Sequence, residues 1–122
     1  AEVNRLRELV QSHRVYFVTS RTGDTALGQT KAWLESYLGY GPYSVIIAKA
    51  KAEIARAIRA DFSIEDKAGN AIAISWMAPN CLSYLINRLH NQVDMNVVGS
   101  RVIRVNTVAN YLDAVEGKFD DR

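Results

Sequence analysis

Short apolar runs alternate in this sequence with segments of helical periodicity, and this alternation limits the folds open to the chain. The runs VYFVT (residues 15–19) and SVIIA (residues 44–48) lack the apolar–polar alternation of a half-exposed strand. Continuous runs of this length are typical of strands buried on both faces, as in a parallel sheet. The sequence therefore predicts an α/β protein.

The remaining segments extend this pattern along the chain. We expect strands at residues 15–19, 44–48, 62–65, 81–87 and 101–105. We expect helices at residues 1–11, from 24 or 25 to 38, and at 51–60, 71–77 and 108–115, where apolar residues recur every three or four positions. Gly39 and Gly117 are expected just beyond the ends of two of these helices. Together these elements predict one domain, residues 1–122, with helices on both faces of a mainly parallel sheet.

The composition excludes several classes of protein. The 122 residues are 48% hydrophobic and 23% charged, as in an ordinary folded domain. The net charge of +2 is too small to indicate nucleic acid as a partner. Cys81 alone cannot form an intrachain disulfide, and His13 and His90 have no metal-ligand spacing. No apolar run approaches the roughly 20 residues of a membrane span, so we expect a cytoplasmic protein without membrane contact.

Polar side chains follow three of the predicted strands. In an open parallel sheet, ligands bind beyond the carboxyl ends of the strands. Hydroxyl groups and lysine suit a phosphate, and adjacent carboxylates suit Mg²⁺. Solvated strand ends also carry such residues, so each signal alone has a purely structural alternative. The residues concerned are Thr19 and Ser20, Lys49 and Lys51, and Glu65 and Asp66.

These segments resemble three motifs of the haloacid dehalogenase (HAD) superfamily of phosphohydrolases. VYFVTSR resembles motif II, an apolar strand that ends in Thr or Ser. KAEIARAIRAD places Lys51 where motif III has its lysine, with Lys49 as the second choice. DFSIED (residues 61–66) resembles the acidic motif IV. The likeness runs from about residue 15 to residue 115 and is closest to nucleotidase-like and polynucleotide-phosphatase-like members.

The resemblance implies a Rossmann-like three-layer α/β/α fold and Mg²⁺-dependent hydrolysis of a phosphomonoester. The substrate would be a phosphorylated small molecule or a nucleotide. Thr19, Ser20 and Lys51 would bind its phosphate, and Glu65 and Asp66 would hold Mg²⁺. Arg21 could also touch the phosphate.

The sequence departs from the family at motif I. That motif is Asp-x-Asp at the end of the central strand, it supplies the nucleophile, and no Asp-x-Asp occurs in this chain. The chain therefore has no catalytic nucleophile and reads as a HAD-like domain, residues 1–122, that is N-terminally incomplete relative to the family. It is either a piece of a longer enzyme or a degenerate domain. Strands 15–19 and 62–65, which flank the central strand in the family, must pair directly or leave a gap for a protein partner or a second copy.

A second hypothesis is a catalytically inactive descendant of the HAD fold. It would be an assembly or binding module, for example a structural component of a phage-like particle or another large complex. A nucleic-acid-binding module is the weakest alternative, because the arginines are scattered and form no basic stripe. Trp33 and Trp76 are expected on helices, packed in a core or an interface.

Overall fold

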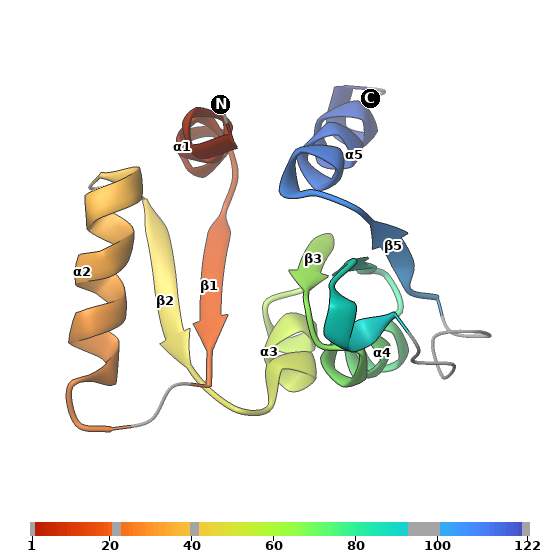
Figure 1. The fold of residues 1–122 in the computed structure, drawn as a ribbon, viewed down its shortest axis with the longest axis horizontal. Helices are drawn as coiled ribbons and strands as arrows, with labels where there is room; N and C mark the ends of the chain where they lie inside the picture. The colour runs from red at the N-terminus through yellow and green to blue at the C-terminus, as the bar shows by residue number, and fades with distance from the viewer. Residues whose placement is uncertain (1, 21–22, 40–41, 93–100, 121–122) are drawn as a thin grey trace. The chain divides into compact units, whose positions relative to one another are not determined.

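Helices and parallel strands alternate along the chain in the computed structural model, which describes residues 2–20, 23–39, 42–92 and 101–120 (Figure 1). The helices are α1 (Glu2–Ser12), α2 (Ala26–Leu38), α3 (Lys51–Ala57), α4 (Ala68–Met77) and α5 (Val108–Asp120), with a short 3₁₀ turn, η1 (Leu89–Asn91). The strands are β1 (Val15–Thr19), β2 (Tyr43–Ile47), β3 (Phe62–Glu65), β4 (Leu82–Ile86) and β5 (Ile103–Val105). Every strand pair is parallel. The predicted α/β class is confirmed.

The strands form two small sheets, whereas a single sheet was predicted. One sheet has the order β1-β2 and the other β3-β4-β5. Among the described residues, no strand pairing joins β1 to β3, so each is an edge strand of its own sheet. The chain divides in the same way into two compact units, residues 1–49 and residues 50–122. Each unit is described by itself below.

The first unit contains α1, β1, α2 and β2. Val15 to Thr19 of β1 lie opposite Tyr43 to Ile47 of β2 in register. Phe17 and Tyr43 meet edge to face across this pair, with ring centroids 5.4 Å apart. Helix α2 runs beside β2 (Figure 1) and ends at Gly39, whose φ of 72° is a conformation that glycine adopts without strain. The buried apolar side chains of this unit are Val10, Ala26, Leu34 and Leu38.

In the second unit, helices contact both faces of the central strand β4. The buried Ser83 hydroxyl donates a 2.7 Å hydrogen bond to the carbonyl oxygen of Ala71 in α4. Tyr84 packs edge to face against Tyr111 of α5, with centroids 5.2 Å apart. Successive side chains of a strand point to opposite faces. Therefore α4 and α5 cover opposite faces of β4, and residues 83–86 are all buried.

Helices α3 and α4 pack through small side chains. Ala52 and Ala55 of α3 form a buried cluster with Ile74 of α4, and the cluster also contains Ala78 and Cys81. Burial raises the pKa of the Cys81 thiol, which disfavours the nucleophilic thiolate. Cys81 is thus a small buried hydrophobic residue, as its position in a predicted strand suggested.

Some element boundaries differ from those predicted. Helix α4 begins at Ala68, not at residue 71, and buries both Ala68 and Ala71. Helix α5 continues through Gly117 to residue 120. A helical glycine costs only about 1 kcal/mol relative to alanine, so Gly117 does not end α5, whereas α2 ends at Gly39, where φ is 72°. Trp33 and Trp76 lie on helices as expected, but with 59% and 57% of their surface exposed they are not core residues.

Every helix among the described residues is too short or too polar to span a bilayer.

Candidate functional site

Lys51 and Glu65 form an ion pair at the carboxyl end of β3. Lys51 is the first residue of α3, and Glu65 is the last residue of β3. The Nζ atom of Lys51 lies 3.5 Å from Oε1 of Glu65, and the two side chains are only 17% and 13% exposed. Because solvent reaches these charges poorly, the pair is screened less than an ion pair on an open surface.

Burial and the lysine act on Glu65 in opposite directions. Burial is the larger effect and raises the pKa of the Glu65 carboxyl above its ordinary value of 4.5. The charge of Lys51 and its hydrogen bond lower the pKa, and the neighbouring Asp66 raises it. Lys51 therefore offsets part of the effect of burial on the pKa of Glu65.

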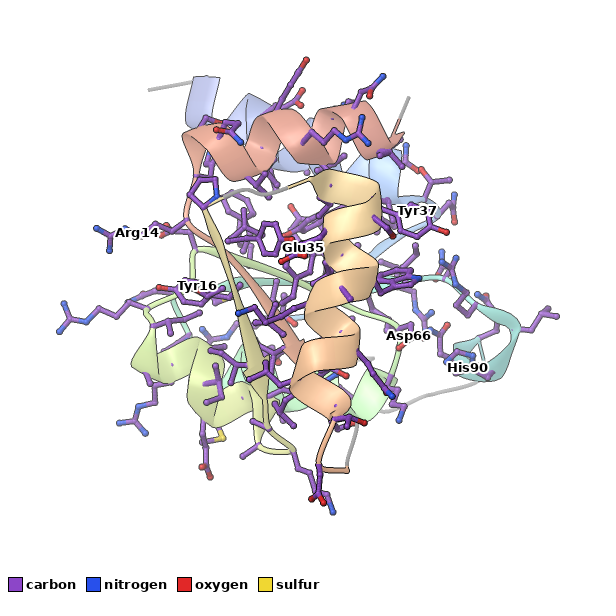
Figure 2. The ribbon with its side chains drawn as sticks, turned by 90° about the vertical axis from the view of Figure 1, so that its left-hand side faces the viewer. Arg14, Tyr16, Glu35, Tyr37, Asp66 and His90 are labelled. Carbon is purple, nitrogen blue, oxygen red and sulfur yellow. The ribbon has the colours of Figure 1, made fainter. Side chains whose placement is uncertain are left out.

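Asp66 follows Glu65 and is exposed to solvent, while its main-chain carbonyl group is held by hydrogen bonds. Its carbonyl oxygen lies 2.9 Å from Nε2 of His90 and 2.7 Å from Nδ2 of Asn91. Figure 2 shows Asp66 and His90 next to each other at the end of the unit. Because a carbonyl oxygen only accepts, Nε2 of His90 carries the hydrogen. These two donors hold the backbone of Asp66 in place while its carboxylate remains open to solvent.

The buried side chain of Asn91 connects the ends of β3 and β4. Its Nδ2 donates to the carbonyl oxygens of Asp66 at 2.7 Å and of Ile86 at 2.9 Å. Its Oδ1 accepts a 3.0 Å bond from the backbone N–H of Arg88. Asn91 has no exposed surface, and every polar atom of its side chain has a partner.

Arg104 extends this network to β5. Its Nη1 donates to Oδ1 of Asn87 at 2.8 Å and to Oδ1 of Asn91 at 3.3 Å. Its Nη2 donates to the main-chain oxygen of Asn91 at 2.7 Å. Asn87 in turn donates to Oδ1 of Asn106 at 2.7 Å. The carboxyl ends of all three strands of this sheet are therefore joined by polar side chains.

Comparisons of the chain with protein-family models, with curated proteins and with solved structures find no match. The resemblance to HAD phosphohydrolases therefore depends on the sequence motifs alone.

The structure brings together some of the residues that the sequence indicated. Lys51 and Glu65 are in contact, and Asp66 is the next residue. Thr19 ends β1 and Ser20 follows it, both within the first compact unit. Lys49 belongs to that unit too, whereas Lys51 belongs to the second. Arg21 is outside the described residues.

Sequence reasoning missed the polar network at the ends of β4 and β5. Asn87 directly follows β4, and Asn106 directly follows β5. Their positions at strand ends are the same signal that indicated the other candidates. In the sequence, Arg104 is one of several scattered arginines that form no basic stripe. Asn91 could not be identified from residue spacing. It contacts the carbonyl oxygen of Asp66 because the η1 turn places its side chain there.

Of the two acids that the motif IV resemblance assigns to Mg²⁺, Asp66 is the more accessible to a metal ion. Mg²⁺ prefers oxygen ligands and is often held by one or two carboxylates, with water and phosphate oxygens completing its shell. The exposed carboxylate of Asp66 fits this role. Glu65 fits it less well, because Lys51 already lies against Oε1. Among the described residues, no group of three or more His, Cys, Asp or Glu side chains could form a metal site by itself.

Proposed function

We propose that this chain is a HAD-like phosphohydrolase domain of the nucleotidase type, which takes part in Mg²⁺-dependent hydrolysis of a phosphomonoester. The observation that carries the proposal is the ion pair between Lys51 and Glu65 beside the exposed Asp66. In this ion pair, the lysine of the segment that resembles motif III contacts an acid of the segment that resembles motif IV. The same contact favours Lys51 over Lys49 as the motif III residue.

Each side chain then has a distinct role. The Lys51 ammonium neutralises the substrate phosphate, and Glu65 holds the ammonium in position. The carboxylate of Asp66 is the principal ligand for Mg²⁺, which when bound would offset charge on the phosphate oxygens. The hydroxyl groups of Thr19 and Ser20 donate hydrogen bonds to the phosphate, as their motif II resemblance implies.

The nucleophile must come from a strand outside this sequence. β1 and β3 are both edge strands, and they are the strands that flank motif I in the family. In the HAD resemblance, a strand ending in Asp-x-Asp pairs with the motif II and motif IV strands of a Rossmann-like three-layer α/β/α fold. The strand would come from another segment of a longer chain or from a protein partner, because a second copy of this sequence also lacks Asp-x-Asp.

The second candidate is a non-catalytic assembly or binding module of the same fold. The absence of Asp-x-Asp from the sequence favours it, because the covalent step has no candidate residue. The open edges of β1 and β3 would then serve for attachment to another chain.

Hydrolysis of an aryl phosphate with Mg²⁺ tests the two candidates. The sample is the 122-residue chain joined, through a flexible linker, to an apolar strand that ends in Asp-x-Asp. We expect activity that falls on the order of 100-fold in Lys51→Gln and in Asp66→Asn. The matched control is Asp61→Asn, an exposed acid just before the amino end of β3, which should retain activity.

Two results would count against the enzyme. A folded extended chain with no hydrolysis would favour the assembly module. Hydrolysis that survives both Lys51→Gln and Asp66→Asn would show that the reaction does not use the site at the end of β3.

A further inference from the structure

Two guanidinium groups converge on one neutral residue, Asn87. Arg104 donates from Nη1 to Oδ1 of Asn87 at 2.8 Å. Arg88 donates from Nη1 to the main-chain oxygen of Asn87 at 3.2 Å. In the part of the chain that the structure describes, neither arginine pairs with a carboxylate. Two like charges thus contact the same residue with no counter-charge among the described residues, an arrangement that an anion would stabilise.

The hydrogen bonds of Arg104 leave one edge of its guanidinium group available. A guanidinium has five N–H donors. The contacts with Asn87 and Asn91 use both hydrogens of Nη1 and one hydrogen of Nη2. Among the described residues, no acceptor contacts the Nε hydrogen or the second Nη2 hydrogen. Side by side, these two donors match the two oxygens of a carboxylate or a phosphate.

The partners of Arg104 are neutral although its side chain is half-buried. A cation withdrawn from water loses hydration that amide and carbonyl oxygens replace only in part. Asn106 adds a side-chain NH₂ donor beside Asn87. Its Oδ1 accepts the hydrogen bond from Asn87, and the residue is exposed to solvent. An oxyanion would satisfy these donors and balance both charges.

We propose that Arg88 and Arg104 form an oxyanion-binding site at the carboxyl ends of β4 and β5, which holds a second anionic group of the substrate. Strands lie about 4.8 Å apart in a sheet, so β5 is about 10 Å from β3 and its ion pair. The substrate class is therefore a phosphomonoester with a further phosphate or carboxylate at this distance. The assignment to a substrate depends on the proposed function, whereas the binding of an oxyanion does not.

Titration with inorganic phosphate, without divalent metal and at low ionic strength, tests the site in the 122-residue chain. The NMR signals of the arginine Nε–H groups report binding. We expect saturable shifts at Arg88 and Arg104, with affinity about tenfold weaker in Arg88→Gln. Arg104→Lys should weaken binding similarly, because it keeps the charge but loses the paired donors. The control is Arg56→Gln, exposed on α3.

The variants separate this proposal from a failure to fold and from the proposed function. Arg88 is exposed and its side chain lies outside the buried network, so Arg88→Gln should fold normally. Lys51→Gln should leave the arginine shifts intact, since it alters only the site at β3. Acetate in place of phosphate shows whether a carboxylate also binds. Shifts that do not saturate, or equal weakening in Arg56→Gln, would overturn the proposal.

Discussion

The side-chain nitrogen of Asn91 lies 2.7 Å from the carbonyl oxygen of Asp66 and donates a hydrogen bond to it across 25 positions of sequence. The same nitrogen donates to Ile86, the last residue of β4. One buried amide therefore fixes the backbone that carries the exposed carboxylate of the candidate site. The position of Asp66 depends on Asn91 as much as on strand β3.

Asn91→Ala should lower the free energy of unfolding by about 2–4 kcal/mol, because it removes the side-chain donor to the carbonyl oxygens of Ile86 and Asp66 and the acceptor of the Arg88 N–H, while Asp66 keeps its contact with His90. Urea denaturation followed by circular dichroism measures the change. The control is Asn110→Ala, exposed on α5, which should alter stability by less than about 0.5 kcal/mol. Equal effects of the two substitutions would show that the network contributes little.

Glu65→Gln should change how stability depends on pH. The native pKa of Glu65 is raised above 4.5, so the folded state binds this proton more tightly than the unfolded state does. Its contribution is present below the ordinary pKa and is lost as pH rises through the raised value. Glutamine does not titrate. The free energy of unfolding of the variant, relative to the native protein, should therefore increase as the pH rises above about 4.5.

Denaturation curves across this range provide the measurement for Glu65. Glu53→Gln, which removes an exposed acid from α3, controls for the loss of a negative charge in general. The free energy of unfolding of Glu65→Gln minus that of the native protein could instead stay constant or decrease as pH rises. Burial would then not be the dominant influence on the pKa of Glu65.

Lys51→Gln should raise the pKa of Glu65 further, since the ammonium is the strongest influence that lowers it. Carbon-13 NMR of the glutamate carboxyl carbons measures the change directly. Lys49→Gln removes a lysine close to Lys51 in sequence that is not among the causes of the Glu65 pKa shift, and it should leave the titration unaltered. A Glu65 titration that is the same in both variants would contradict the ion pair.

The order of helices and strands could be predicted because each strand is a short apolar run and each helix has its own periodicity. Boundaries were less predictable where packing outweighs local preference. Helix α4 starts at Ala68 in spite of Gly69 and Asn70, because Ala68 and Ala71 are buried against Leu85. The two-sheet arrangement could not be predicted from strand patterns alone, since they do not say which edges pair.

The candidate site was predictable only where its residues follow strands directly. Lys51, Glu65 and Asp66 were found by that argument, and the structure places Lys51 against Glu65. The roles of Asn91 and Arg104 depend on contacts between residues far apart in sequence, which no local spacing reveals. The exposure of Trp33 and Trp76 likewise follows from the way the helices dock, not from their helical positions.

The most direct test of the central claim is phosphate binding at the end of β3 in the presence of Mg²⁺. An NMR titration of the 122-residue chain would follow the Lys51 ammonium and the Asp66 amide. We expect saturable shifts at both groups that require Mg²⁺, with affinity about tenfold weaker in Asp66→Asn and unchanged in Asp61→Asn. Shifts that do not depend on Mg²⁺, or equal affinity in the two variants, would contradict it.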